Sequence, residues 1–390
     1  MGAYWPGSES TGPNLSLKEL CRAMANDFEF KLVARDRPFG AAMATVKSGH
    51  WIDRGFATAR YCAISPWGAE ELQTILTETP HDLLWLNGFF DREFTLPALT
   101  LRRLGRIPRR PTLLSPRGEM AVGALGIKPG RKSAWLATAR HSGLLRDVWL
   151  HATGPREHDD IATRFPWSKG IIEAPNVRVM IAPCASTSGL RVGGDVCRLA
   201  FLGRIARVKN LDYALAVLGR VRANVAFDIY GPVSEPDYWM ECGQLISALP
   251  SHISVTYKGE IANDDVPVVL GGVDMLFLPT KGENFGHAIF EALACGVPVL
   301  ISDQTPWQNL ERQGAGWSLP LEEMPRYTAA INALAAMTTV QRAVLARSAR
   351  GVAERWQSES GAYEKNLTML ETLLGRVKSA RSCMWEAANS

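Results

Sequence analysis

Short apolar runs alternate with stretches of helical periodicity along most of the chain. In the N-terminal half, runs typical of strands lie at residues 28–34, 61–64, 83–86, 112–114, 148–151 and 171–173. In the C-terminal half, the corresponding runs lie at residues 199–202, 225–230, 253–257, 275–278 and 298–301. Alternation of strands and helices is typical of parallel sheets that are covered on both faces, so we expect an α/β fold.

A segment of small and turn-forming residues separates the two series of strands. It covers residues 182–195 and reads APCASTSGLRVGGD. A chain of 390 residues exceeds the roughly 100 to 200 residues of an ordinary domain. We therefore predict an N-terminal domain over 1–182, a C-terminal domain over 195–355, and a final helix and tail over 356–390.

Composition narrows the class of protein. No run of about 20 apolar residues occurs, and the N-terminus, MGAYWPGSESTGP, lacks the pattern of a secretion signal, so we expect a cytoplasmic location. The 7 cysteines are scattered and never form a C-x-x-C pair. This argues against a disulfide framework and against a zinc site.

Charge is distributed unevenly behind a formal net charge of +4. Residues 102–146 are rich in Lys and Arg, with Glu119 as the single acid, whereas acids dominate residues 259–323. A basic face can bind lipid headgroups, a phosphorylated acceptor or nucleic acid, and it can also be simply solvated. Nucleic acid is the least expected partner, because no recognised module or aromatic platform accompanies the basic residues.

The most informative segment is residues 278–307, LPTKGENFGHAIFEALACGVPVLISDQTPW, which reads as strand, loop, helix and strand. In α/β proteins, ligands bind at the carboxyl ends of strands, where such a loop lies. The helix is expected to open at Asn284, Phe285 and Gly286, whose backbone N–H groups would then face a bound anion.

Two carboxylates bracket this helix opening. Glu283 precedes it, and Glu291 lies about one and a half turns inside the helix. Carboxylates accept pairs of hydrogen bonds, so both side chains suit the hydroxyl groups of a sugar and a ribose. On spacing alone, Glu283 could instead cap the helix and Glu291 could be an ordinary surface residue.

A second group of residues lies in FLGRIARVKNLD, residues 201–212. Arg204 and Lys209 flank the expected start of a helix, where a cation is unfavourable unless an anion lies between the two. Gly203 would let the backbone approach that anion closely. A phosphate is the simplest candidate, and solvent-exposed surface charges are the alternative.

Together these segments resemble the family 4 glycosyltransferases, retaining enzymes of the GT-B fold. Gly203, Arg204 and Lys209 match a Gly-Arg-x4-Lys turn, and Glu283 with Glu291 matches a Glu-x7-Glu element. The resemblance implies two Rossmann-like domains that face each other across a cleft, with the C-terminal helix packed back on the first domain. It also implies that Arg204 and Lys209 neutralise the donor diphosphate, that Glu283 and the following amides hold the sugar, and that Glu291 binds the ribose.

The resemblance extends more loosely to a bacterial subgroup that assembles surface polysaccharides, through residues 10–14, 85–94, 115–120 and 150–161. The residues that these segments place on the acceptor side are Gly12, Asn87, Arg117 and Glu119. Here the usual Gly-Gly loop reads Thr11-Gly12, the first strand is shortened or missing, and Asn87 replaces the frequent His.

Two of these side chains have a plainer alternative. Arg117 and Glu119 could form a local ion pair or remain surface charges. His151 lies in an apolar strand, and we expect a core histidine rather than a catalytic one.

The expected activity is transfer of a sugar, with retention of configuration, from a nucleotide-diphosphate-sugar to a glycan or lipid-linked glycan. The catalytic residues would be Glu283, Arg204 and Lys209, and they would act electrostatically without a metal or other cofactor, since no Asp-x-Asp motif is present. The acceptor would be met at the inner face of an anionic membrane. A catalytically silent subunit and a nucleotide-sugar epimerase of similar fold are the alternatives.

Overall fold

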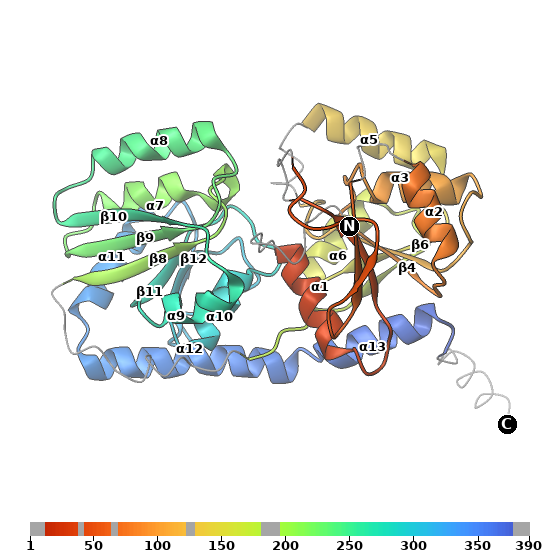
Figure 1. The fold of residues 1–390 in the computed structure, drawn as a ribbon. Helices are drawn as coiled ribbons and strands as arrows, with labels where there is room; N and C mark the ends of the chain where they lie inside the picture. The colour runs from red at the N-terminus through yellow and green to blue at the C-terminus, as the bar shows by residue number, and fades with distance from the viewer. Residues whose placement is uncertain (1–11, 38–42, 64–68, 122–128, 181–195, 377–390) are drawn as a thin grey trace, which may run out of the picture. The chain divides into compact units, whose positions relative to one another are not determined.

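The chain divides into two compact units, which we call unit 1 (1–178 and 360–390) and unit 2 (179–359). The computed structural model describes residues 12–37, 43–63, 69–121, 129–180 and 196–376 (Figure 1). The boundary expected near residue 355 thus falls at 359, and the expected linker at 182–195 lies outside the described residues.

Unit 1 is built around a parallel sheet with the strand order β4-β5-β6-β7. Its strands are β4 (Leu84–Asn87), β5 (Thr112–Ser115), β6 (Val148–Ala152) and β7 (Gly170–Glu173). Four helices alternate with these strands along the chain. They are α2 (Glu70–Glu78), α3 (Thr95–Arg103), α5 (Pro129–Ser142) and α6 (Pro155–Arg164). All four residues of β5 are buried, as expected for a central strand covered on both faces.

The first apolar runs of the chain form a separate, smaller sheet. It has the order β1-β3-β2, and its strands are β1 (Lys31–Arg35), β2 (Trp51–Asp53) and β3 (Thr58–Cys62). Helix α1 (Gly12–Ala23) packs on it through Leu17 and Cys21, which share a cluster with Ala34 and Tyr61. The main sheet of unit 1 therefore starts at β4 within the described residues.

Helix α13 (Ala362–Leu373) completes unit 1 although it comes last in the described chain. Its Met369 and Leu370 lie in one buried cluster with Leu20 of α1 and Leu113 of β5. The amide of Asn366 also donates to the carbonyl of Pro175, with 2.7 Å between nitrogen and oxygen. The expectation that the C-terminal helix packs on the first domain is confirmed.

Unit 2 contains a parallel sheet of six strands in the order β10-β9-β8-β11-β12-β13. The strands are β8 (Cys197–Leu202), β9 (Val225–Tyr230), β10 (Ile253–Gly259), β11 (Met275–Leu278), β12 (Val299–Ser302) and β13 (Gly316–Leu319). Its helices are α7 (Leu211–Leu218), α8 (Pro236–Ser247), α9 (Val266–Leu270), α10 (His287–Ala294), α11 (Met324–Ala336) and α12 (Thr339–Glu359). In Figure 1, α7 and α8 lie on one side of this sheet, and α10 and α12 on the other. The expected α/β architecture is confirmed.

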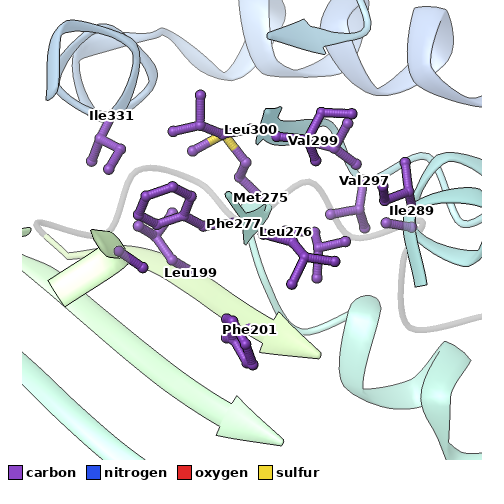
Figure 2. Close-up of a cluster of buried hydrophobic side chains, with 14 of the residues drawn as sticks. Leu199, Phe201, Met275, Leu276, Phe277, Ile289, Val297, Val299, Leu300 and Ile331 are labelled. Atoms are coloured by element: carbon purple, nitrogen blue, oxygen red, sulfur yellow. The ribbon is translucent and has the colours of Figure 1, made fainter. Parts of the chain in front are cut away.

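The core of unit 2 follows from its two most apolar strands. Every residue of β11 and β12 is buried. Figure 2 shows Met275 and Phe277 of β11 beside Leu300 of β12, with Ile289 of α10 closing the cluster from the helix layer. Apolar area removed from water contributes about 25 cal/mol per Å², so these strands form a stable platform for the loops at their ends.

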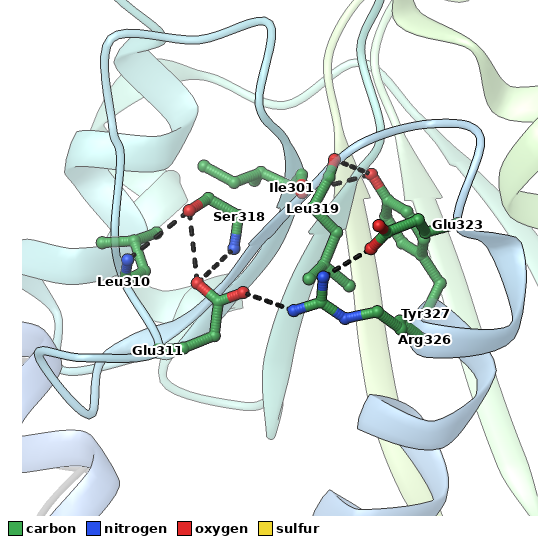
Figure 3. Close-up of polar contacts among 8 residues, drawn as sticks. All are labelled: Ile301, Leu310, Glu311, Ser318, Leu319, Glu323, Arg326 and Tyr327. Carbon is green, nitrogen blue, oxygen red and sulfur yellow. Dashed lines mark hydrogen bonds and ion pairs between the residues drawn. The ribbon is translucent and has the colours of Figure 1, made fainter.

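Several acidic side chains of residues 259–323 have structural roles at the edge of this sheet. Figure 3 shows the carboxylate of Glu311 between Ser318 of β13, whose backbone N–H lies 3.2 Å away, and Arg326 of α11, at 3.4 Å. Tyr327 donates its hydroxyl to the Leu319 carbonyl at 2.6 Å. These contacts attach α11 to β13, a strand that the apolar pattern did not predict.

Candidate functional site

The two predicted motifs meet at the carboxyl edge of the unit 2 sheet. Strands β8 and β11 are neighbours, so the loop after β8 lies beside the loop after β11. The backbone N–H of Lys281 donates to the Val208 carbonyl at 2.8 Å, and the buried amide of Asn210 donates to the Pro279 carbonyl at 3.0 Å. These hydrogen bonds hold the two loops together before any ligand binds.

Lys209 and Glu283 form an ion pair across this junction. Their side chains retain 17% and 12% exposure, so the pair is largely shielded from water yet still accessible. Gly203 lies against the aliphatic part of Lys209, since a Cβ built on it would be 3.8 Å from the lysine Cδ. The structure thus brings Gly203, Lys209 and Glu283 to one place.

Arg204 follows Gly203 and is exposed. Within the described residues its guanidinium has no recorded hydrogen bond or ion pair, and none with Glu283 in particular. An arginine without a protein partner beside a Lys–Glu pair has its donors available to a ligand anion.

The loop between β11 and α10 differs in one detail from the expectation. Asn284, Phe285 and Gly286 precede the helix, which begins at His287, with Gly286 as the N-cap in a left-handed conformation (φ 81°). An alanine there would place its Cβ 2.8 Å from Ile289 Cδ1, so glycine is required. The first N–H groups of an α-helix lack i−4 carbonyl acceptors within the helix, which is the property that an anion site uses.

The side chain of Phe285 belongs to the core and leaves only its backbone for a ligand. Its ring lies 5.7 Å from that of Trp307 and 5.0 Å from that of Trp356, measured between centroids. Trp307 Nε1 also donates to the Phe285 carbonyl at 2.6 Å. This indole fixes the backbone of the loop from behind.

Both simpler interpretations of the two glutamates are wrong. Within the described residues, the recorded side-chain contact of Glu283 is its ion pair with Lys209, so it does not cap the helix. Its own N–H donates to the Gln304 carbonyl at 3.0 Å. Glu291 retains only 7% exposure and is therefore not a surface residue. The carboxylate of Glu291 therefore lies within the fold, in the second half of α10.

In unit 1, Asn87 and Arg117 are in direct contact. Arg117 Nε donates to Asn87 Oδ1 at 3.0 Å, and its Nη1 donates to Asn176 Oδ1 at 3.1 Å. Burial lowers the pKa of Arg117 to about 10, although the nearby Glu157 carboxylate acts in the opposite direction. The guanidinium nevertheless stays charged at neutral pH.

Glu119 does not pair with Arg117, so the predicted local ion pair is absent. Its Oε2 accepts hydrogen bonds from the backbone N–H groups of Phe89 and Phe90, the second at 3.1 Å. Burial raises the pKa of Glu119 to about 7, and these two hydrogen bonds partly offset that rise. Glu119 thus anchors the turn that follows Asn87, the last residue of β4.

Gly12 is the first residue of α1 rather than part of a loop, and its carbonyl accepts the Ser16 hydroxyl at 3.0 Å. The prediction of a Thr11-Gly12 loop is therefore wrong for Gly12, while Thr11 lies outside the described residues. No contact between Gly12 and the Arg117 group is recorded in the described part of the chain.

His151 is a core histidine, as expected. Its Nε2 lies 2.8 Å from the Ala174 carbonyl, which only accepts, so Nε2 carries the proton. Its Nδ1 then accepts from the Ser115 hydroxyl at 2.7 Å, and Ser115 accepts from Trp85 Nε1 at 2.8 Å. Burial lowers the pKa of His151 to about 4, which keeps the ring neutral.

Three supporting residues were not found from the sequence. Asn176 orients Arg117, Trp307 holds the loop before α10, and Gly231 allows β9 to approach the loop after β8. A Cβ on Gly231 would lie 2.1 Å from the Gly203 carbonyl oxygen. A glycine directly after a buried strand was the available signal for Gly231, whereas nothing local marks the other two.

Among the described residues, no group of three or more His, Cys, Asp or Glu side chains is arranged to hold a metal ion. Nor does this part of the chain contain a helix with the length and apolar character needed to cross a membrane.

Comparison with known proteins identifies the same region. Residues 197–337 match the family model described as "Glycosyl transferases group 1". A D-inositol 3-phosphate glycosyltransferase of Mycobacterium marinum is 31% identical over 157 residues, which cover 39% of this chain and 33% of that protein. The aligned part thus spans a minor share of the relative's own length.

Solved structures extend the likeness to the whole fold. A sucrose-phosphate synthase from Thermosynechococcus elongatus has a TM-score of 0.70 at 17% identity, covering 93% of this chain and 94% of that one. Anabaena HepE, solved with UDP and glucose, has a TM-score of 0.67 at 17% identity, covering 94% and 97%. The chain therefore has the GT-B fold, with two Rossmann-like units.

Proposed function

Because residues 197–337 carry a domain of the glycosyl transferases group 1 type, we propose that this protein transfers a sugar from a nucleotide-diphosphate-sugar to a hydroxyl group of an acceptor. The observation that carries the proposal is the junction of the two loops in unit 2. There Lys209 and Glu283 are paired, and Arg204 next to Gly203 has no partner among the described residues. A glucose-type donor with uridine diphosphate is the first candidate, since the structure of HepE holds UDP and glucose.

The geometry supports an electrostatic mechanism. As the bond between the sugar's anomeric carbon and the diphosphate oxygen breaks, negative charge develops on the diphosphate. We propose that Arg204, Lys209 and the amides before α10 stabilise that charge. Glu283 would hold the hydroxyl groups of the sugar, and Glu291 those of the ribose.

We further propose retention of configuration, in line with the resemblance to retaining enzymes. The acceptor oxygen would bond to the anomeric carbon from the face that the diphosphate leaves, and its proton would pass to the departing phosphate oxygen. This route needs no protein base, which agrees with an amide, Asn87, where many similar enzymes carry a histidine.

For the acceptor we propose a glycan or lipid-linked glycan used in surface polysaccharide assembly, bound by unit 1 at the inner face of the membrane. The support is a patch at the amino edge of the main sheet, in the loops before β5 and β6. We call it the amino-edge patch, and it consists of the exposed residues Arg103, Leu104, Arg106, Arg109, Arg110 and Arg146.

The composition of the amino-edge patch suits an anionic bilayer. None of its arginines forms an ion pair among the described residues, and Leu104 is 65% exposed. Arg102 is excluded from it, because its guanidinium donates to the carbonyls of Arg146 and Asp147 and so holds the loop before β6. Each basic group near an anionic surface contributes about 1 kcal/mol of attraction.

The donor site is tested with Arg204→Ala, compared with Arg222→Ala, an exposed arginine of the same unit. We expect Arg204→Ala to lower the transfer rate by about 100-fold or more and to weaken nucleoside diphosphate binding, with an unchanged melting temperature. Arg222→Ala should behave as wild type. Full activity of Arg204→Ala would refute the site, and wild-type protein that binds donor without transferring sugar to any acceptor would indicate a silent subunit.

The membrane proposal is tested by sedimentation with vesicles of neutral lipid and with vesicles containing about 30% anionic lipid. The triple variant Arg106→Glu, Arg109→Glu and Arg110→Glu should lose binding to anionic vesicles. A control with Arg220→Glu, Arg222→Glu and Arg347→Glu changes the net charge equally in unit 2 and should retain it. Equal losses in both variants would contradict a localised patch.

A further inference from the structure

Arg117 is a partly buried cation without an ion-pair partner in the described structure. Its two recorded hydrogen bonds go to the neutral amide oxygens of Asn87 and Asn176. The Glu157 carboxylate favours its charged form electrostatically. Buried charges in proteins are generally paired, so an isolated guanidinium calls for an explanation.

Glu157 is already committed to the backbone. Its Oε1 accepts from the Gly118 N–H at 2.6 Å, and its Oε2 accepts from both the N–H and the hydroxyl of Thr153, at 2.8 and 2.7 Å. A carboxylate with this many donors holds the loops after β5 and β6 in position. It therefore does not serve as a direct counter-ion for Arg117.

The orientation of Arg117 is fixed at a cost. The residue adopts a left-handed backbone conformation (φ 56°), which is unusual for a side chain other than glycine, and Gly118 follows with φ 80°. Such strain amounts to about 1 to 3 kcal/mol and persists where the surroundings enforce it, typically at functional sites. Nε and Nη1 are occupied, while Nη2 has no recorded partner in the described chain.

The position of Arg117 is that of a ligand site. It lies two residues beyond β5, at the carboxyl edge of a parallel sheet, where ligands of α/β proteins bind. The amino-edge patch lies at the opposite end of the same strands. With four residues in β5 and about 3.3 Å per residue, the two places are roughly 13 Å apart, too far to share one small anionic group.

We propose that Arg117, aimed by Asn87 and Asn176, binds an oxyanion group of the acceptor, either a phosphate or a carboxylate. This inference rests on the proposed glycosyltransferase function and adds a substrate class to it. The amino-edge patch then serves the membrane surface alone, and Arg117 distinguishes charged acceptors from neutral ones. Arg117 would contact the acceptor away from the reacting hydroxyl, as a specificity-determining residue.

The first experiment uses inorganic phosphate as the probe and thermal unfolding as the measurement. Uridine diphosphate at saturation first occupies unit 2, and phosphate is then titrated against chloride at constant ionic strength. Wild type should gain stability from phosphate by mass action. Arg117→Gln should lose this gain in stability. Arg117→Lys should need about tenfold more phosphate for the same gain, because an ammonium group lacks the oriented pair of N–H donors of a guanidinium. Arg22→Gln should match wild type.

The outcomes separate the two proposals. If uridine diphosphate does not stabilise wild type, the proposed function fails. If it does, but phosphate stabilises wild type and Arg117→Gln equally, the oxyanion site fails. Weaker uridine diphosphate binding in Arg117→Gln would also overturn it, because Arg117 would then serve the donor.

Two safeguards keep the test decisive. If Arg117→Gln does not fold, Asn176→Ala is the alternative. This variant keeps the cation but removes one of the two amides that accept its hydrogen bonds, and it should weaken phosphate binding severalfold. Competition with hexose 6-phosphate, a hexuronate and neutral hexose in the transfer assay then separates phosphate from carboxylate. Inhibition by the neutral sugar as strong as that by both anions would refute the proposal.

Discussion

Lys209 and Glu283, 74 residues apart in the chain, form an ion pair at the centre of the proposed donor site. A diphosphate that recruits the Lys209 ammonium group has to compete with this carboxylate. Donor binding would therefore exchange one anionic partner of Lys209, the Glu283 carboxylate, for another.

Replacing Glu283 by Gln should consequently have opposite effects on binding and on transfer. Uridine diphosphate should bind about fivefold more tightly, because an ion pair worth about 1 kcal/mol no longer competes for Lys209. Sugar transfer should fall by about 100-fold, because the carboxylate that holds the sugar is lost. Calorimetry and initial rates measure the two effects. Glu354→Gln, which removes an exposed partner of Arg350, is the control, and weaker nucleotide binding in Glu283→Gln would contradict the exchange.

Gly286 and Gly282 offer a matched pair in the loop before α10. Gly286→Ala places a side chain at φ 81° and 2.8 Å from Ile289, so we expect a loss of about 2 kcal/mol in unfolding free energy and severalfold weaker donor binding. Gly282→Ala meets no atom within 4 Å and should be close to wild type in both. Urea unfolding and nucleotide titration provide the comparison, and equal behaviour of the two variants would exclude a conformational role for Gly286.

Trp307→Phe isolates one hydrogen bond within the aromatic cluster. The ring packing is largely kept, but the buried carbonyl of Phe285 loses its donor, which costs about 1 to 3 kcal/mol. We expect a lower melting temperature and a several-fold higher KM for the donor. Trp356→Phe, in the same cluster, should leave that KM unchanged. A KM that rises equally in both variants would assign the effect to packing.

Glu119 should make stability depend on pH. With a folded pKa of about 7 against an ordinary value of 4.5, the folded state keeps a proton between about pH 4.5 and 7 that the unfolded chain has released. Wild-type stability therefore falls as pH rises through this window. Glu119→Gln has no such titration. Its free energy of unfolding, relative to that of wild type, should therefore rise by about 2 kcal/mol from pH 5 to pH 8.

Urea unfolding at the two pH values measures this difference. Glu78→Gln, which removes an exposed carboxylate of α2, should show the same pH dependence as wild type. A constant difference between Glu119→Gln and wild type at both pH values would refute the raised pKa.

The features that were predicted most accurately from the sequence are those that a local pattern of residues determines. Strands β11 and β12 were located to within a residue because every position in them except Ser302 is apolar. The two motifs of unit 2 were found because their first residues follow buried strands directly. Strand β13, GWSL, was missed because its two middle residues are only partly buried and leave no apolar run.

Other features depend on tertiary contacts and are not encoded locally. One such feature is the attachment of α10 to α12, where Arg350 donates to the Ala294 carbonyl at 2.7 Å. Likewise, the contacts of Arg117 with Asn87 and Asn176 join residues that are distant in sequence.

The place of α13 has a consequence for synthesis on the ribosome. Every strand of unit 2 has been made by Leu319 and its last helix by Glu359, whereas the core of unit 1 requires Met369 and Leu370. Translation proceeds from the N-terminus, so the second unit to be encoded is the first that can fold to completion. Until α13 emerges, Leu20 and Leu113 lack the side chains of Met369 and Leu370 that complete their cluster. A nascent chain arrested before residue 360 would expose this surface to chaperones and proteases.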